Sequence, residues 1–380
     1  MTISCKYKCT CIVCVRFWWC VWAQCPGLGP VRLAQLVDLA LSLGLSLQDL
    51  WAWPLSRLQR ELDWPERVLL ALDRYRASAG EDPLRLCPKR FLVPADQLWP
   101  KGFSDLERQP SLLVWDGDGR LLAPLAEGRS VAVVGSRRAS AQGIRAAELL
   151  GARLASAGWP VVSGLAEGVD AAAHRGCLSA GGQPVAVLGT PLERVYPPEH
   201  ARLQRQVADS GLLLTELAPG AGISRATFAL RNRLMVALAG DVVVVECPET
   251  SGALLSAAEA QRQGRSLWVL PADALRPSAK GSNALLCRGA QPIVDLGQWV
   301  SDLGPGPLMP PSAPVCDALT RSSTHQQVDP ELMALLQHTT SLPALARQLN
   351  RRQDRLAMHL MDLELRGLVV AEPGMRWRLA

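Results

Sequence analysis

Between residues 129 and 300, short uninterrupted apolar runs alternate with stretches of helical periodicity, and this alternation limits the fold more than any other feature. The runs are rich in Val, Leu and Ala and lie at 131–134, 160–162, 184–188, 211–214, 241–245 and 267–270. An unbroken apolar run indicates a strand that is buried on both faces of a parallel sheet. Because helical segments separate the runs, we predict an α/β domain with a Rossmann-like, doubly wound parallel sheet over 129–300.

Two smaller segments with other patterns flank this domain. Residues 26–80 have helical periodicity around the turn 26–30, Pro-Gly-Leu-Gly-Pro, which predicts a helical domain of the SAM-like or helix-hairpin-helix kind. The amides of such a turn can hold one phosphate, or its glycines can serve only a tight interhelical turn, and one copy leaves both interpretations open. In 329–380, helical patterns at 331–337, 342–349 and 352–366 precede two short strands that pair as a hairpin, and this order predicts a winged helix.

The remaining segments are expected to connect or precede these domains. Residues 81–128 are rich in Pro and Trp and are predicted to form a connecting region with a short hairpin at 113–119. Residues 301–328 contain a dense run of prolines, which predicts an extended linker. Residues 1–25 hold six of the eleven cysteines and are interpreted as a leader that is not conserved, or as the result of a start codon placed too early.

The cysteines and the hydropathy suggest the compartment. The leader contains Cys11-x-x-Cys14 without a histidine or a second pair at zinc spacing, so a metal site there is only weakly indicated. Its apolar stretch, 11–23, is well short of the roughly 20 residues that span a bilayer. The other five cysteines are scattered singly, as is typical of buried thiols in a reducing compartment. We therefore expect a cytoplasmic protein without membrane insertion.

Composition sets the broad class but not the ligand. Hydrophobic residues make up 48% and charged residues 20% of the 380, which indicates a folded globular chain. The net charge of +5, from 40 Lys+Arg against 35 Asp+Glu, is only mildly basic. Net charge alone therefore does not indicate nucleic-acid binding, and the placement of the arginines must decide.

The first candidate site follows the run at 131–134. Gly135 and Ser136 could present backbone amides to a phosphate, and Arg137 and Arg138 would add guanidinium donors. Ligands of doubly wound sheets bind beyond the carboxyl ends of the strands, next to helix N-termini. The motif is not G-x-G-x-x-G, which disfavours a dinucleotide, and we expect no cofactor and no metal.

The second candidate segment is 163–170, Ser-Gly-Leu-Ala-Glu-Gly-Val-Asp. The small residues Ser163, Gly164 and Ala166 would allow the backbone to approach a ligand closely. Asp170 and His174 share one helical face and could form an acid/base pair, but a first-turn acid and a locally packed histidine are the stronger interpretation.

Two further segments complete the candidate set. At 224–233, phosphate-binding cations and an amide surround one aromatic ring, the combination that sequence-tolerant binding of single strands requires. The members of this group are Arg225, Phe228, Arg231, Asn232 and Arg233. After the run at 241–245, the amides of Ser251 and Gly252 could hold another phosphate.

These segments together resemble one known family. Gly135-Ser136-Arg137, the 163–170 segment with Ala173-His174, Tyr196-Pro197, Phe228 with 231–233, and 251–254 occur densely and in order over 129–295. They are similar to the DNA-processing protein A family (DprA, or Smf). Ala229 stands where the family usually has proline, and the leader has no counterpart in the family.

The resemblance implies a homodimer that binds single-stranded DNA, protects incoming DNA and loads the RecA recombinase during natural transformation. It implies DNA contacts at Arg137 and in 225–233, and it places Lys280 in a late pocket loop. It leaves open whether the winged helix binds DNA or protein, which surface dimerises and whether the source organism is transformable.

We expect a protein without catalytic chemistry, and two other classes remain as alternatives. A nucleotide phosphoribohydrolase has a related fold, but residues 248–252, Pro-Glu-Thr-Ser-Gly, lack the double glycine and downstream glutamate of its phosphate loop. A transcription regulator acting through the winged helix would leave the arginine motifs of the large domain unexplained.

Overall fold

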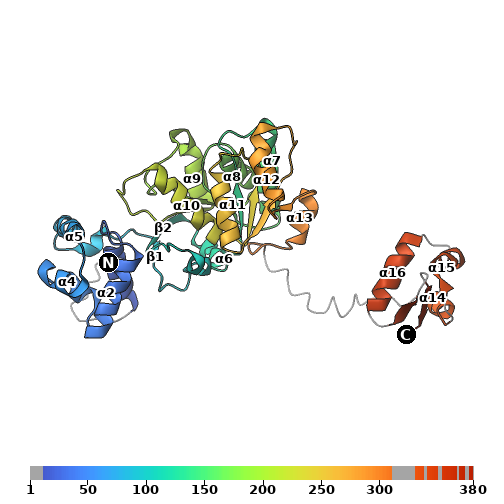
Figure 1. Ribbon diagram of the computed structural model, residues 1–380, viewed down its shortest axis with the longest axis horizontal. Helices are drawn as coiled ribbons and strands as arrows, with labels where there is room; N and C mark the ends of the chain where they lie inside the picture. The colour runs from blue at the N-terminus through green and yellow to red at the C-terminus, as the bar shows by residue number, and fades with distance from the viewer. Residues whose placement is uncertain are drawn as a thin grey trace. The chain divides into compact units, whose positions relative to one another are not determined.

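The structure, a computed structural model, describes residues 12–309, 330–337, 340–349, 353–365, 368–372 and 376–379. The chain divides into a main unit, Met1–Met309, and a C-terminal unit, Pro310–Ala380. Figure 1 shows the helices and strands of each unit. None of the helices in the described ranges is both long and apolar enough to span a membrane.

A mixed sheet forms the centre of the main unit. Its strands are β1 (Phe91–Leu92), β2 (Leu113–Gly117), β3 (Val131–Val134), β4 (Val161–Ser163), β5 (Pro184–Val187), β6 (Leu212–Thr215), β7 (Asp241–Val244), β8 (Ser266–Val269) and β9 (Gln291–Pro292). They lie in the order β1-β2-β6-β5-β4-β3-β7-β8-β9, parallel from β6 to β9. The chain winds outward from β3 to β6 and then returns to place β7 on the other side of β3. The predicted doubly wound sheet is confirmed, and its six predicted strands agree with β3–β8 to within one residue.

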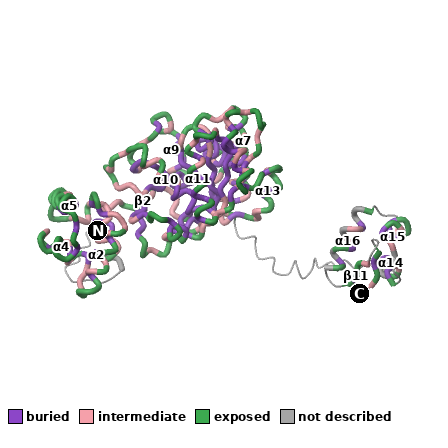
Figure 2. Tube along the Cα trace, viewed as in Figure 1, coloured by how far each residue is buried: buried purple, intermediate pink, exposed green. Residues whose placement is uncertain are grey.

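Helices cover both faces of this sheet, which explains the continuous apolar runs. They are α6 (Leu122–Ala126), α7 (Ala141–Ser156), α8 (Val169–Ser179), α9 (Ala201–Ser210), α10 (Arg225–Ala237), α11 (Ala253–Arg262), α12 (Lys280–Leu286) and α13 (Leu296–Asp302). On β3, Ala132 and Val134 pack in one core cluster with side chains of α10 and α11, whereas Val131 and Val133 pack in another with side chains of α7 and α8. Figure 2 shows this buried centre in purple.

Residues 81–128 do not simply connect two domains. β2 pairs antiparallel with β6 and with β1, so this segment adds an edge to the sheet. The hairpin expected at 113–119 is wrong, because the chain continues from β2 into a 3-10 turn and α6. A strand that pairs with distant strands leaves no local signal of its partners, and the sequence alone therefore suggested a local hairpin.

The N-terminal helices are α1 (Ile12–Ala23), α2 (Pro30–Leu43), α3 (Leu47–Trp51), α4 (Leu55–Leu62) and α5 (Glu66–Ala79). The second half of the expected leader lies inside this fold, as α1: Trp22 is fully buried in the helical core and Cys20 packs against β1 and β2. Arg16 also pairs with Asp96 at 2.9 Å. Cys11 and the Cys14 side chain lie outside the described residues. Gly27, in the turn before α2, has φ +85°, as a tight turn requires.

The first residues of the expected linker also pack on the main unit. Gly306 N donates to Ala157 O at 2.8 Å and Leu308 N donates to Gly158 O at 3.0 Å. Trp159 Nε1 donates to Gly304 O at 2.9 Å. No helix follows α13 as far as Met309, as expected, but backbone hydrogen bonds hold the chain against the residues after α7 as far as Leu308.

The C-terminal unit contains α14 (Pro330–Leu335), β10 (Thr340–Ser341), α15 (Leu342–Gln348), α16 (Gln353–Leu365), β11 (Val369–Glu372) and β12 (Arg376–Leu379). β11 pairs antiparallel with β12, and β10 adds a third short strand. The expected helices and hairpin are present within a few residues, around a small core that includes Leu360 and Trp377.

Candidate nucleic-acid interface

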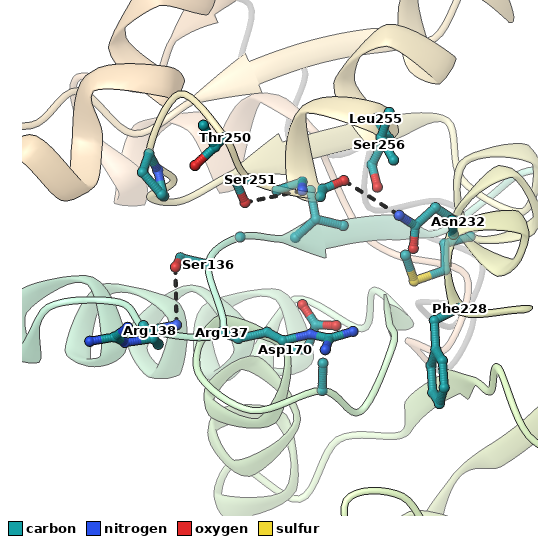
Figure 3. A pocket seen from close by; sticks show the side chains of 18 of the residues that line it. Ser136, Arg137, Arg138, Asp170, Phe228, Asn232, Thr250, Ser251, Leu255 and Ser256 are labelled. Atoms are coloured by element: carbon teal, nitrogen blue, oxygen red, sulfur yellow. Dashed lines mark hydrogen bonds between the residues drawn. The ribbon is translucent and has the colours of Figure 1, made fainter. Parts of the chain in front are cut away.

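A cavity of about 660 Å³ opens between the carboxyl ends of β3 and β7, where the strand order reverses. It is lined by the loops that follow β3 and β7, by one side of α10 and by the start of α11 (Figure 3). This is the switch point of a doubly wound sheet, where the two adjacent loops separate and leave a crevice. Most of the predicted site residues meet here, which their positions along the sequence could not establish.

The charges that line the cavity are mostly positive. The arginines are Arg137, Arg138, Arg225 and Arg231, and the acidic residue is Asp170. Arg137, Arg138 and Arg225 are exposed, whereas Arg231 and Asp170 are buried, with 4% and 6% exposure. Because Arg231 is buried, three exposed guanidinium groups remain for an anionic ligand.

An aromatic platform lies beside these cations. The Arg137 guanidinium carbon is 5.9 Å from the centre of the Phe228 ring, and the Tyr196 and Phe228 rings are 4.8 Å apart. Gly189 makes room for this ring, since a Cβ there would come within 2.7 Å of Phe228 Cδ1. A smaller cavity of about 160 Å³ lies between Tyr196, Phe228 and Gly164. A phosphate clamp and a stacking surface are thus adjacent.

Arg231, Asp170 and His174 are buried next to the exposed part of the site. Arg231 Nη1 donates to Val187 O, and Gly164 allows the approach, because a Cβ at Gly164 would lie 1.7 Å from that nitrogen. Burial raises the pKa of Asp170, and the nearby Arg231 charge opposes the shift. Burial lowers the pKa of His174 to about 3, so the ring is neutral at pH 7. Neither ring nitrogen of His174 has a partner among the described residues, which favours the packed histidine over the acid/base pair.

Several backbone amides expected to bind phosphate already have partners. Ser136 N donates to Glu246 O at 2.7 Å, and Ser251 N donates to Pro248 O at 3.1 Å. Gly135 serves packing, since a Cβ there would come within 2.5 Å of Val169 Cγ2. Among the groups that were expected to bind phosphate, the arginine side chains are therefore better placed than the backbone amides of Ser136 and Ser251.

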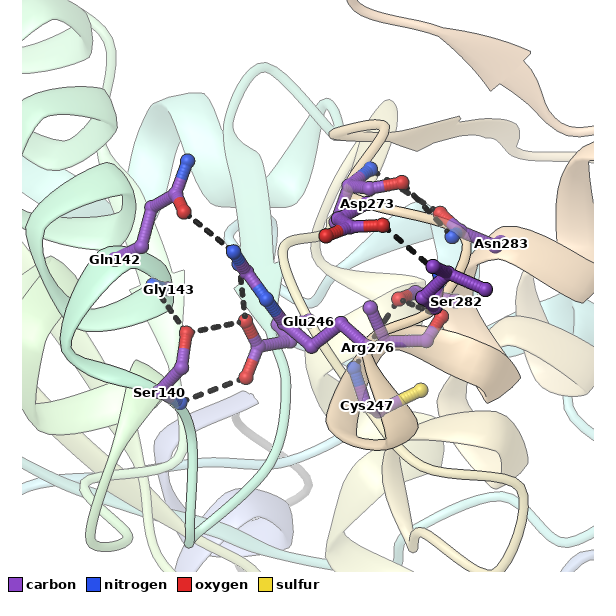
Figure 4. A network of polar contacts seen from close by, with 12 residues as sticks. Ser140, Gln142, Gly143, Glu246, Cys247, Asp273, Arg276, Ser282 and Asn283 are labelled. Atoms are coloured by element: carbon purple, nitrogen blue, oxygen red, sulfur yellow. Dashed lines mark hydrogen bonds and ion pairs between the residues drawn. The ribbon is translucent and has the colours of Figure 1, made fainter.

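Glu246 connects the two sides of the site (Figure 4). Its carboxylate accepts hydrogen bonds from Ser140 N and Ser140 Oγ, both at 2.7 Å, at the N-terminus of α7. It also pairs with Arg276 at 3.6 Å, and Arg276 Nη2 donates to Gln142 Oε1 at 2.6 Å. Burial alone would raise the pKa of Glu246, but the Ser140 amide and hydroxyl, Ser278 and Arg276 together lower it. The carboxylate thus takes the anionic position at the α7 N-terminus.

We expect Glu246→Gln to lower the free energy of unfolding by about 1–3 kcal/mol at pH 7, because an amide replaces a charged acceptor. The folded-state pKa of Glu246 is lowered, so the stability it contributes is present above about pH 4.3 and is lost as the pH falls through the folded-state value. Urea unfolding at a series of pH values should show the difference between wild type and variant shrinking below about pH 4.3. The exposed Glu249→Gln is the control; a Glu246→Gln difference that stays constant with pH would contradict the role.

Three predicted contacts line neither the large cavity at the switch point nor the smaller one beside Tyr196. Arg233 is buried and pairs with Glu216. Ser163 is fully buried, and its hydroxyl donates to Val133 O at 2.6 Å. Lys280 begins α12 and is exposed, but Pro277 and Ser278 are the residues of its loop that line the cavity. The remaining predicted residues lie at the two cavities, with Gly164 at the smaller one, and Asn232 Nδ2 reaches Gly252 O at 3.5 Å.

Sequence reasoning missed several residues that the structure brings to the site. Thr250, Ser256 and Ser278 line the large cavity, and Tyr196 lines the small one. Tyr196 was visible in the Tyr-Pro motif, but nothing in the sequence placed its ring against Phe228. Glu246 directly follows the apolar run of β7, and a carboxylate at a strand's carboxyl end was the available signal.

A doubly wound sheet with a cationic cavity at its switch point is typical of α/β proteins that bind phosphate-bearing ligands. Comparison with known proteins identifies the family: residues 90–304 match the model for DNA recombination-mediator protein A. The chain belongs to this family, as the motif resemblance had indicated.

Individual relatives cover most of the chain. The protein Smf of Synechocystis sp. is 30% identical over 95% of this chain and 98% of its own length. The crystal structure of DprA from Streptococcus pneumoniae has a TM-score of 0.64 and 26% identity, covering 75% of this chain and 97% of that one. A structure of DprA from Helicobacter pylori, described in terms of its single-stranded DNA binding mode, has a TM-score of 0.50 and 31% identity, covering 56% and 95%.

Proposed function

We propose that this protein binds single-stranded DNA in the cavity at the switch point, and that it protects incoming DNA and loads the RecA recombinase onto it during natural transformation. The observation that carries the binding proposal is the exposed Arg137 beside the Phe228 ring. A guanidinium can hold a phosphate while the ring stacks on the neighbouring unpaired base. The H. pylori relative, with its single-stranded DNA binding mode, supports the same ligand class.

We propose a binding role without catalysis. A hydrolase of the phosphoribohydrolase kind needs a free carboxylate beside the ligand. Asp170, the acidic residue that lines the cavity, is buried next to Arg231, and Glu246 is occupied by Ser140 and Arg276. Glu249 is exposed and is not part of the cavity lining. Incubation with nucleoside monophosphates should release no free base.

The other parts of the proposal come from the sequence patterns and from the family resemblance. We propose that the N-terminal helices form a SAM-like domain, that the C-terminal unit is a winged helix, and that the protein acts in the cytoplasm as a homodimer. The domains are proposed at 26–80, 129–300 and 329–380, with α1 added to the first and β1–β2 to the second. Sedimentation of the purified chain tests the dimer, and RecA filament formation on coated single strands tests the loading.

The full chain is expected to bind an oligothymidylate more tightly than the matched duplex, because paired and stacked bases cannot reach the Phe228 ring. Affinity should fall steeply between about 50 and 200 mM salt as counterions are released from the phosphates. Fluorescence anisotropy with single- and double-stranded probes at matched salt measures both effects. Equal affinity for the duplex would remove the basis of the proposal.

A further inference from the structure

A second cavity continues the first one across the surface of α10 and α11. It has a volume of about 520 Å³ and shares the residues Ala229, Asn232 and Leu255 with the cavity at the switch point. Its far side is formed by Arg108, in the loop before β2, and by Arg262, in the last turn of α11. Because they share these lining residues, the two cavities form one continuous groove. We call the second cavity the α10–α11 extension.

The extension has cations that can reach a ligand. Arg108 is exposed, and within the described ranges its side chain has no hydrogen-bond or ion-pair partner. The Arg262 side chain is 59% exposed; it pairs with Glu259, whose carboxylate also accepts from Gln263 Nε2 at 2.7 Å. Arg233, by contrast, is buried and bound to Glu216. The lining of the extension thus has two exposed cations, Arg108 and Arg262, and one exposed acidic side chain, Glu107. The other acidic side chain, Glu259, is mostly buried.

An apolar surface lies between these cations and the first cavity. Leu255 is 55% exposed although it is a large hydrophobic residue, and Ala229 beside it is exposed as well. A single strand of DNA presents apolar base faces and anionic phosphates alternately along its length. A surface with apolar side chains between arginines matches that alternation, as in other grooves that bind single strands without sequence preference.

We propose that a single strand bound at Phe228 and Arg137 leaves the switch point through the α10–α11 extension, with phosphates at Arg108 and Arg262 and a base face over Leu255. This proposal rests on the proposed function and adds a direction and a length to the binding site. The site of one chain then holds more nucleotides than the first cavity alone, and affinity rises with strand length until the extension is filled.

The test measures affinity of the full chain for oligothymidylates of about 4 to 20 nucleotides, with the double variant Arg108→Ala/Arg262→Ala. The variant is expected to bind the shortest strands as the wild type does, and to bind the longest at least about tenfold more weakly, with a salt slope shallower by about two units. Arg202→Ala/Arg205→Ala, which removes two exposed arginines of α9 outside both cavities, is the matched control and should bind all lengths normally. The variant Arg108→Lys/Arg262→Lys keeps both positive charges, and its affinity should rise with strand length nearly as the wild type's does.

The outcomes separate this proposal from the one it rests on. If the wild type binds no single strand of any length, the proposed function fails. If the wild type binds and gains affinity with length, but Arg108→Ala/Arg262→Ala gains equally, the strand leaves by another route and the extension is wrong. Weaker binding of every length by the variant, short strands included, would also overturn it, because the arginines would then act on the first cavity. Arg108 and Arg262 are exposed, as are Arg202 and Arg205 of the control, so none of the double variants should change the temperature of thermal unfolding.

Discussion

Arg231→Met is expected to lower the free energy of unfolding of the main unit by about 1–3 kcal/mol, because it leaves the buried Val187 O without its charged donor and removes the positive charge near buried Asp170. Methionine keeps much of the side-chain volume, so a cavity contributes little. Urea unfolding followed by tryptophan fluorescence measures the loss. The sequence motif suggested a DNA contact for Arg231, whereas its burial and its bond to Val187 O indicate a support for the cavity.

A double variant and a control make this interpretation testable. Adding Asp170→Asn to Arg231→Met removes the carboxyl group that the Arg231 charge acts on and should recover part of the lost stability, which gives a coupling energy between the two sites. Arg225→Met, on the exposed first turn of the same helix, should leave stability within about 0.5 kcal/mol of the wild type. If Arg231→Met unfolds like the wild type and only loses DNA binding, Arg231 is a ligand contact and its structural role is wrong.

Arg137→Ala is expected to weaken single-strand binding by about 1–3 kcal/mol, tenfold or more, and to make the salt slope shallower by about one unit. Its guanidinium is exposed after the end of β3, beside the Phe228 ring, in the cavity that buried Arg231 and Asp170 also line. The loss of one phosphate contact removes both affinity and one released counterion. Anisotropy titrations at several salt concentrations give the two quantities together.

Phe228→Ala should differ from Arg137→Ala in how its affinity for single strands depends on salt. A lost stack costs roughly 1–3 kcal/mol per base but releases no counterion, so affinity should fall while the salt slope stays unchanged. Arg202→Ala, an exposed α9 arginine outside the cavities, is the control for a general loss of charge. The assignment of a phosphate clamp and a stacking platform fails if Arg137→Ala binds normally, or if Phe228→Ala changes the slope.

The sequence predicted the strands well where burial on both faces leaves a local signature. β3, with the sequence Val-Ala-Val-Val, is apolar on both faces, and β7, with Asp-Val-Val-Val, is apolar on both faces after its first residue. A sheet covered by helices on both sides buries such segments. The sequence did not predict that β2 pairs with β6, about a hundred residues away. It also did not predict α1, whose cysteines suggested a leader although Cys20 and Trp22 are buried. Pairing and burial over such distances leave no periodicity in the segment itself.

For the site, the sequence by itself determined the chemistry: arginines, one phenylalanine and small residues after apolar strands indicated an anionic, base-bearing ligand. Only the tertiary structure decided which of them can reach that ligand. Arg231 and Arg233 follow Phe228 in the same motif, yet both are buried because α10 is covered on more than one side from Arg231 onward, while Arg137, from the loop after β3, lies beside the ring. The physical reason is that residue type sets charge and shape, whereas exposure and contact depend on the helices and strands packed around each side chain.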